Sequence, residues 1–253
     1  MGEAETSQLR PGIDADDHQS WSRQPRAAAG ELHFVLQYAA MTENESLSVE
    51  LRKATAEVHR QAESSAFVER FTNGTVDSAI HSRHLRALQP VYAALEDGLT
   101  RHQHDPRLRA FFLPQLWRTS ALEDDLRFLL GDDWRRHDPV PAAVEYADRL
   151  TDLSSRTPLL LISHAYVRYL GDLSGGQMLR RLAVQNLGLE HDGLRFYEFP
   201  EIDSAGEFKI DFRRRLDELT LEEAERQLVV DEAREAFRLN SAIFAQLVAE
   251  DGS

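Results

Sequence analysis

Apolar residues recur at helical spacing along nearly the whole chain from Leu47 onward, and this pattern most restricts what the chain can fold into. Residues three or four positions apart lie on one face of an α-helix. No stretch alternates apolar and polar residues between hairpin turns, the pattern that indicates strands. We therefore expect an all-α fold with a single domain. The first segment shows the spacing in Leu47, Leu51, Ala54, Val58 and Ala62.

Further helices are predicted on the same grounds, with ends set by residues that cap or break helices. The "FTNG" segment, 71–74, is expected to end the first helix. Thr157 and Pro158 are expected to begin a long helix and Gly188 to end it. Pro90 should kink or interrupt its helix, because proline removes a backbone donor. The expected ranges are about 76–102, 107–112, 119–130, 140–154, 158–187, 204–218 and 221–250.

The first 44 residues differ in character from the rest. They are rich in Gly, Ala, Ser, Asp and Gln and show no sustained period, which is typical of a disordered segment. We therefore predict a disordered extension over 1–44 and one helical domain over 45–250.

Composition excludes several classes of protein. The formal charge of −14 argues against a general nucleic-acid binder. The absence of cysteine rules out disulfides, zinc fingers, iron–sulfur clusters and cysteine nucleophiles. No apolar run approaches the length of a membrane span, and the first residues lack the pattern of a signal peptide. We therefore expect a cytoplasmic protein with no membrane span.

The first predicted helix carries a polar stripe at the border of its apolar face. Arg52, Thr55, His59 and Glu63 are spaced so that they share this stripe. A lone histidine in such a place is most often a packed or surface residue. Alternatively, His59 is a single axial metal ligand whose ring Glu63 orients. One histidine suits haem, because the macrocycle supplies the other four ligands.

The stretch "LGDLSGGQML" places three glycines inside a predicted helix, where each costs about 1 kcal/mol relative to alanine. Gly171 and Gly175 are four residues apart and form a smooth strip. This strip is typical of two helices that pack closely, because glycine has no side chain. It is equally typical of a surface for a flat ligand laid against the backbone, because the ionisable Asp172 and Arg168 lie beside it. The residues alone favour neither of these two interpretations.

Two later segments add polar candidates. Lys209 and Arg213 share one helical face, which is either a solvated basic surface or a grip for ligand carboxylates. Phe237 is expected in the core, and Asn240 is either an amide at the core edge or part of a polar network.

The remaining histidines do not form a metal site by spacing. His81 and His84 lack a third ligand nearby and are expected on the surface, as are His102 and His104. No Glu-x-x-His pair occurs, which argues against a di-iron bundle.

Four segments taken together resemble the haem oxygenase family: "LRKATAEVHRQAE", "HAYVRYLGDLSGGQ", "FYEFP" and "FKIDFRRR". The resemblance runs from about Leu47 to Val248. It implies a haem oxygenase-like helical fold with haem between a proximal helix and a kinked distal helix. The implied reaction is oxidative cleavage of haem by O2 and external electrons to biliverdin, Fe2+ and CO.

The same resemblance assigns roles to individual residues. His59 matches the proximal iron ligand, and Glu63 matches the residue that hydrogen-bonds to it. Asp172 matches the aspartate that orders distal water. The matching catalytic side of the pocket comprises Asp172, Gly171, Gly175, Arg168, Tyr92 and Asn240. The residues expected to contact haem are Arg52, Thr55, Glu63, Tyr166, Lys209, Arg213 and Phe237.

The resemblance leaves rival functions and implies partners. A haem carrier or sensor would use His59 without turning haem over, whereas a thiaminase-like enzyme would need a cysteine nucleophile. A purely structural protein leaves the glycine run unexplained. Since the chain shows no flavin or nucleotide motif, electrons must come from an external donor, a reductase or a ferredoxin. We expect this donor to dock near the exposed haem edge of a monomer.

Overall fold

The structure, a computed structural model, describes residues 45–249, and within that range it contains helices and no strands. The all-α prediction is therefore confirmed, while the predicted extension over 1–44 lies outside the described residues. The helices are α2 (Leu47–Glu63), α3 (Ala66–Thr72), α4 (Ser78–Arg101), α5 (Thr119–Leu130), α6 (Pro141–Arg156), α7 (Leu161–Gly171), α8 (Gln177–Leu187), α9 (Ala205–Asp217) and α10 (Glu223–Ala249).

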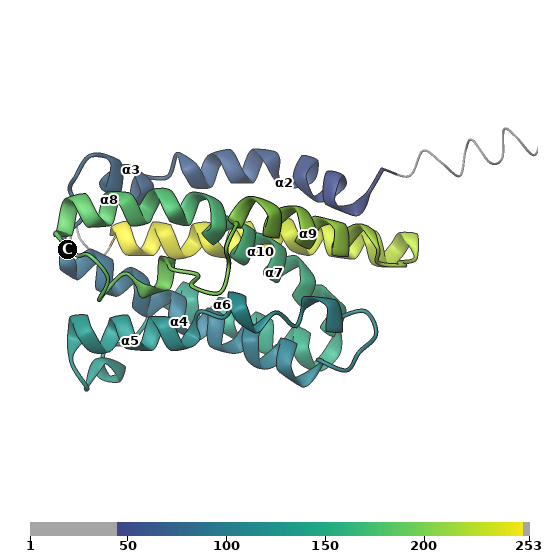
Figure 1. The fold of residues 1–253 in the computed structure, drawn as a ribbon, viewed down its shortest axis with the longest axis horizontal. Coiled ribbons are helices and arrows are strands. Elements are labelled where there is room, and N and C mark those ends of the chain that lie inside the picture. Colours follow the sequence, from purple (N-terminus) through teal and green to yellow (C-terminus); the bar gives the residue numbers. More distant parts are fainter. Residues whose placement is uncertain (1–44, 250–253) are drawn as a thin grey trace, which may run out of the picture. The chain divides into compact units, whose positions relative to one another are not determined.

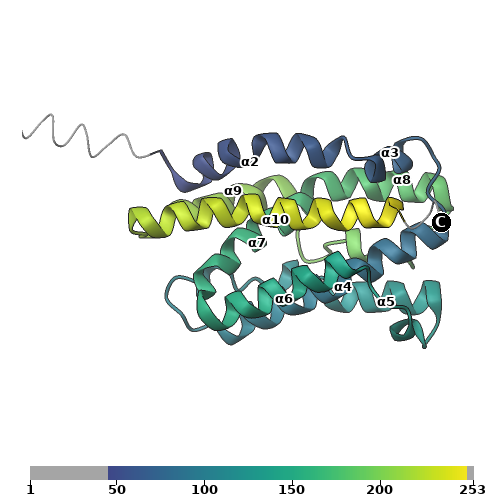
Figure 2. The same ribbon diagram turned by 180° about the vertical axis from the view of Figure 1, so that it is seen from behind.

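Helix α10 lies between two groups of helices. It contacts α2 and α3 on one side and α6 and α7 on the other, and α4 packs against both α5 and α6. Figures 1 and 2 show α2 and α3 on the opposite side of α10 from α4, α5 and α6. This arrangement leaves α7 and α8 facing α2, and the candidate site lies there.

Two predicted helices are divided in the structure. The first ends at Glu63 rather than at 71–74, and the Ser65 side chain accepts a hydrogen bond from the Val68 N–H to begin α3. The second, predicted over 158–187, consists of a 3₁₀ turn, α7, a π-helical turn and α8. The π-helical turn, η5, spans Asp172–Gly176 and coincides with the glycine run.

The other predicted helix boundaries either match those of the structure closely or differ from them for an identifiable reason. Helix α5 has the predicted limits, and Gly188 ends α8 in the left-handed conformation with φ 66°. The segment predicted over 107–112 shortens to a 3₁₀ turn, Arg109–Phe111. Pro90 does not interrupt α4, because Val91 and Tyr92 beside it are fully buried and their packing holds the helix together.

A buried polar cluster joins α6, α7 and α10. His164 Nε2 lies 2.9 Å from Glu232 Oε1, and Arg149 Nε donates to the same oxygen at 3.1 Å. His164 Nδ1 lies 3.0 Å from the Tyr146 hydroxyl. Burial opposes ionisation of Glu232, but the hydrogen bonds from His164 and Arg149 outweigh it and hold its pKa at about 2. This carboxylate therefore stabilises the contact of three helices.

Removing that carboxylate should destabilise the fold in a pH-dependent way. We expect Glu232→Ala to lower the free energy of unfolding by about 2 kcal/mol at pH 7. This loss is smaller than the loss expected on breaking a fully buried ion pair, because the Arg149 side chain is 40% exposed. The pKa falls from 4.5 to about 2 on folding, so the contribution is complete above pH 4.5 and disappears as the pH drops toward 2. Denaturant unfolding at several pH values measures this effect.

The exposed Glu145, which pairs with Arg238 at the surface, supplies the control. Glu145→Ala should change stability by less than about 0.5 kcal/mol. Equal losses in the two variants would contradict a special role for Glu232.

Candidate functional site

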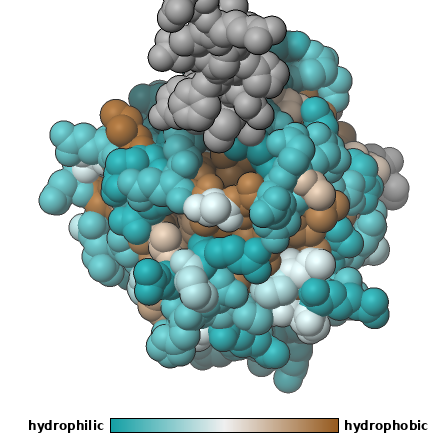
Figure 3. All heavy atoms as spheres, turned by 90° about the vertical axis from the view of Figure 1, so that its right-hand side faces the viewer, coloured by the Kyte–Doolittle hydropathy of each residue, from teal (hydrophilic) through white to brown (hydrophobic). Residues whose placement is uncertain are grey.

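A cavity of about 500 Å³ lies between α2 on one side and α7, η5 and α8 on the other, with α10 completing its wall. Its volume is in the range of small-molecule and cofactor sites. Figure 3 shows apolar side chains in a recess on one face of the molecule, bordered by hydrophilic residues. The cavity thus combines an apolar interior with a polar margin.

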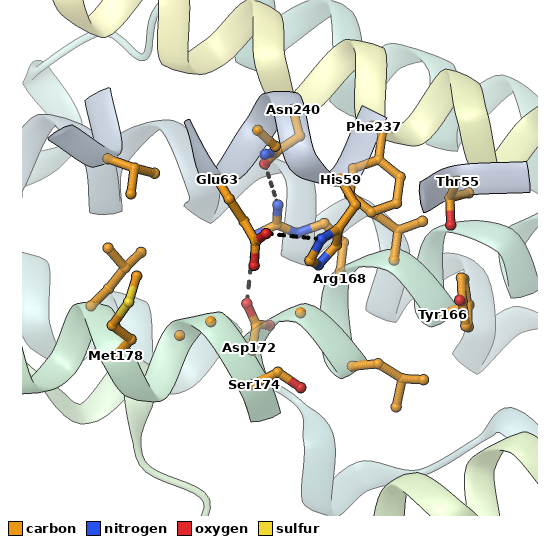
Figure 4. A pocket seen from close by; sticks show the side chains of 18 of the residues that line it. Thr55, His59, Glu63, Tyr166, Arg168, Asp172, Ser174, Met178, Phe237 and Asn240 are labelled. Atoms are coloured by element: carbon orange, nitrogen blue, oxygen red, sulfur yellow. Dashed lines mark hydrogen bonds and ion pairs between the residues drawn. The ribbon is translucent and has the colours of Figure 1, made fainter. Parts of the chain in front are cut away.

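Helix α2 contributes the polar stripe predicted from its spacing. Arg52, Thr55, His59 and Glu63 all line the cavity. Figure 4 shows His59 pointing from α2 toward the segment that carries Asp172. His59 Nδ1 lies 3.4 Å from Glu63 Oε2, so the carboxylate orients the ring and leaves Nε2 for a ligand.

The His59 ring is also fixed from α10. It meets Phe237 edge to face, with ring centroids 5.7 Å apart. Phe237 is only partly buried and lines the cavity, so its prediction as a simple core residue is corrected. His59 keeps a side chain that is 51% exposed, which a packed histidine would not have.

The opposite wall is formed by backbone. A Cβ atom built on Gly171 or Gly175 would meet no heavy atom within 4 Å, apart from the helix's own backbone and chain neighbours. Glycines that allow two helices to pack closely would have a neighbour at that distance. Helix packing therefore does not explain these glycines, whereas the open space beside them is what the prediction of a flat ligand requires.

Behind the glycine wall lies a buried network of Asp172, Tyr92, Arg168 and Asn240. The Tyr92 hydroxyl donates to Asp172 Oδ2, and Arg168 Nε and Nη2 donate to that hydroxyl at 3.1 and 3.0 Å. Arg168 Nη2 lies 3.6 Å from Asp172 Oδ1, and Nη1 donates to Asn240 Oδ1. The structure thus joins four predicted residues from α4, α7, η5 and α10.

The electrostatics of this network favour proton storage on Asp172. Burial raises the pKa of Asp172, although the nearby Arg168 cation opposes the shift. Burial also raises the pKa of Tyr92 well above its usual value, so the phenol remains a donor. Burial disfavours the Arg168 cation, but Tyr92 and Asp172 outweigh it and raise the pKa of the guanidinium. A carboxyl with a raised pKa can take up and release protons nearer neutral pH than an exposed aspartate.

Cationic side chains gather at one margin of the cavity. Arg52 and Arg213 line it, together with Tyr166. Lys209 is not among the lining residues, but its Nζ donates to Ser174 Oγ at 2.9 Å. The predicted basic face of α9 therefore reaches the edge of the cavity, where it could meet ligand carboxylates.

Two histidines predicted on the surface are buried instead. His81 and His84 are 0% and 2% exposed, and His84 lines the cavity. His84, Leu88 and Tyr92 recur every fourth residue on α4, so a place for His84 on the buried face could have been inferred from Tyr92. His102 is half-buried and bonds to the Ser154 carbonyl, and only His104 is exposed as predicted.

Sequence reasoning also missed part of the cavity wall. Ser174, Met178, Phe196, Tyr197 and Phe244 line it without having been singled out. Most are apolar and belong to segments that meet only in the fold, so no local pattern distinguishes them.

Within residues 45–249 no group of three or more His, Asp or Glu side chains could hold a metal ion. Over the same range no helix is long and apolar enough to cross a membrane.

Comparisons with known proteins agree on one family. Residues 45–246 match the family model described as Heme oxygenase. The chain is 36% identical over 203 residues to Heme oxygenase 1 of Synechocystis, covering 80% of this chain and 85% of that protein. It is 41% identical over 207 residues to human Heme oxygenase 1, covering 80% of this chain and 72% of that protein.

Solved structures give the same result. The crystal structure of the Synechocystis heme oxygenase-1 in complex with heme matches with a TM-score of 0.77 and 35% identity, covering 82% of this chain and 96% of that one. Heme oxygenase from Leptospira interrogans matches with a TM-score of 0.76 and 40% identity, covering 80% and 100%.

Proposed function

This chain belongs to the haem oxygenase family, and from that premise we propose which of its residues carry out the reaction. The protein is a haem-degrading enzyme: it cleaves haem oxidatively, with O2 and external electrons, to biliverdin, Fe2+ and CO. The observation that supports our assignment most strongly is the open glycine wall opposite His59, with the buried Asp172 network directly behind it.

Haem fits the residues that surround the cavity. We assign His59 Nε2 as the ligand of the haem iron, with Glu63 holding the ring through Nδ1. The ring plane would lie against Gly171 and Gly175, where no side chain stands in its way. Bound haem supplies the iron at which O2 is reduced.

The basic margin would orient the ring. Arg52, Lys209 and Arg213 are placed to attract the two haem propionates, and guanidinium groups bind carboxylates in a bidentate manner. Holding the propionates would fix how the ring is rotated in the cavity, and this rotation would decide which meso carbon is oxidised.

Asp172 would move protons without touching the ring. Its carboxyl is held by Tyr92 and Arg168, and its raised pKa suits it to accept a proton and pass it on through water. Asn240 fixes the Arg168 guanidinium from α10. A carrier or sensor would have no use for a buried network with this arrangement.

We further propose that the electron donor is a separate protein, a reductase or a ferredoxin, and that the enzyme acts as a monomer. The donor would dock beside the margin formed by Arg52 and Arg213. The cytoplasmic location remains a prediction from the sequence.

Reconstitution with haemin tests the assignment of His59. Given ascorbate or a reductase system, the wild-type protein should lose its Soret absorbance and accumulate biliverdin. His59→Ala should bind haem without the normal ferrous–CO spectrum and form no biliverdin, because the iron lacks its protein ligand. His104→Ala, a change at an exposed histidine, is the matched control. An unchanged ferrous–CO spectrum in His59→Ala would mean that another residue ligates the iron.

A further inference from the structure

One part of the cavity wall is apolar except for a single imidazole. His84 lies there with Leu88 on α4, Val68 on α3 and Phe244 on α10, and we call these four residues the histidine wall. The His84 ring is enclosed by aromatic rings, with its centroid 4.8 Å from Phe67 and 6.0 Å from Phe244. The reaction as assigned above gives this buried imidazole no role.

Three buried polar side-chain atoms, two on α4 near this wall and one on the segment 195–197, have no hydrogen-bond partner among the described residues. They are His84 Nδ1, His81 Nδ1 and the Tyr197 hydroxyl, and each belongs to a residue that is at most 2% exposed. His81 and His84 are one helical turn apart on α4, and the His81 and Tyr197 rings are stacked with centroids 6.2 Å apart. Unpaired buried polar atoms are costly, and proteins usually satisfy them with ordered water.

The three atoms have complementary hydrogen-bonding roles. His81 Nε2 lies 2.8 Å from the Gly193 carbonyl, which can only accept, so Nε2 carries the proton and Nδ1 is an acceptor. Burial lowers the pKa of His81 and lowers that of His84 well below its usual value, which keeps both rings neutral. The Tyr197 hydroxyl can donate. A water molecule can donate to His81 Nδ1 and accept from the Tyr197 hydroxyl.

This polar cluster adjoins the Asp172 network. A Cβ atom built on Gly176 would lie 3.6 Å from Asp172 Cβ and 3.9 Å from Tyr197 Cδ1, so the tyrosine ring and the aspartate flank one glycine. The Arg168 charge also contributes to the lowered pKa of His84. Asp172, Arg168, His84 and Tyr197 all line the same cavity.

We propose that His84, together with His81 and Tyr197, binds buried water beside Asp172, and that this water supplies protons to the Asp172 carboxyl during turnover. The water passes one proton to Asp172 and regains one from the next water in line, so both imidazoles end each cycle neutral. Only the supply of protons rests on the proposed function, because the water site itself would exist in the haem-free protein.

Substitutions at position 84 separate this role from simple packing. Asparagine places a polar atom close to the position of Nδ1, whereas leucine fills similar space without one. We expect His84→Leu to lower the rate of biliverdin formation about fivefold and to enlarge the solvent deuterium isotope effect. This loss of rate is smaller than the loss expected when the proton-transferring group itself is removed. His84→Asn should restore most of the rate. Haem affinity should be the same in both variants.

Water is detected independently of activity. In the haem-free wild-type protein, nuclear Overhauser effects between bound water and the His84 ring protons should reveal water with a long residence time. These effects should weaken in Tyr197→Phe, which removes only the hydroxyl and is expected to fold normally, and the corresponding effects at the His81 ring protons should weaken in His84→Leu.

The proposal is overturned if wild-type His84 shows no contact with bound water. It is also overturned if His84→Leu and Tyr197→Phe both turn over haem at the wild-type rate with an unchanged isotope effect. A wild-type protein that shows the water signals but does not cleave haem would instead contradict the proposed function.

Discussion

Replacing Asp172 with alanine should lower the rate of biliverdin formation by about 100-fold while haem remains bound. A decrease of this size is typical when a positioned group that transfers protons is removed. Haem should still bind because His59 and the basic margin lie on other elements, α2 and α9. Single-turnover absorbance after addition of O2 and an electron source measures the rate, and titration with haemin measures the affinity.

A further variant shows which property of Asp172 matters. Asp172→Asn keeps the size of the side chain and an oxygen that can accept from Tyr92, but it cannot hold a titrating proton. If the carboxyl relays protons, the asparagine variant should be nearly as slow as the alanine variant. An asparagine variant with wild-type rate would show that Asp172 acts only by holding Tyr92 and Arg168 in place. Asp148→Ala, at an exposed site on α6, controls for a general effect of lost charge.

Filling the glycine wall should separate stability from activity. Gly175→Leu places a branched side chain in the space assigned to the haem ring, and we expect haem affinity to fall by about 100-fold, or about 2.7 kcal/mol. Gly175→Ala should stabilise the haem-free protein by up to about 1 kcal/mol, because alanine favours the helix and its Cβ would meet no atom within 4 Å. The same substitution should reduce turnover.

Gly206 is the matched control, since it is a helical glycine in α9 at an exposed position. Gly206→Ala, in the first turn of α9, should stabilise the protein by a smaller amount and leave turnover unchanged. Thermal unfolding of the haem-free proteins and haem titration provide both comparisons. A Gly175→Leu protein that binds haem with wild-type affinity would place the ring elsewhere in the cavity.

Local pattern was sufficient to predict most helices and several site residues. Helix α5 and the end of α8 at Gly188 follow from spacing and capping alone. The stripe of His59 and Glu63 on α2 was also predictable, because residues on one helix have fixed relative directions. Such properties depend only on neighbours in the sequence.

The rest of the site depends on contacts between distant segments. Spacing could not decide whether Gly171 and Gly175 face a neighbouring helix or open space, because that depends on what lies opposite them. His84 was misplaced for the same reason, since the rings of Phe67 and Phe244 that bury it come from α3 and α10. The resemblance to a family supplied roles for the residues, but it did not reveal the buried histidines.

The π-helical turn at Asp172–Gly176 has a consequence for insertions and deletions. A π turn takes up one extra residue in a wider turn, so the helix that follows keeps its direction and deletion of the exposed Ser174 would leave α8 in register. Rewinding the turn as regular α-helix at its full length would instead rotate α8 by about 100° relative to α7. Met178 and Leu179 would then leave the cavity wall, and the buried Ala183 would rotate toward solvent. The wide geometry of this turn therefore keeps the two halves of the helix in register.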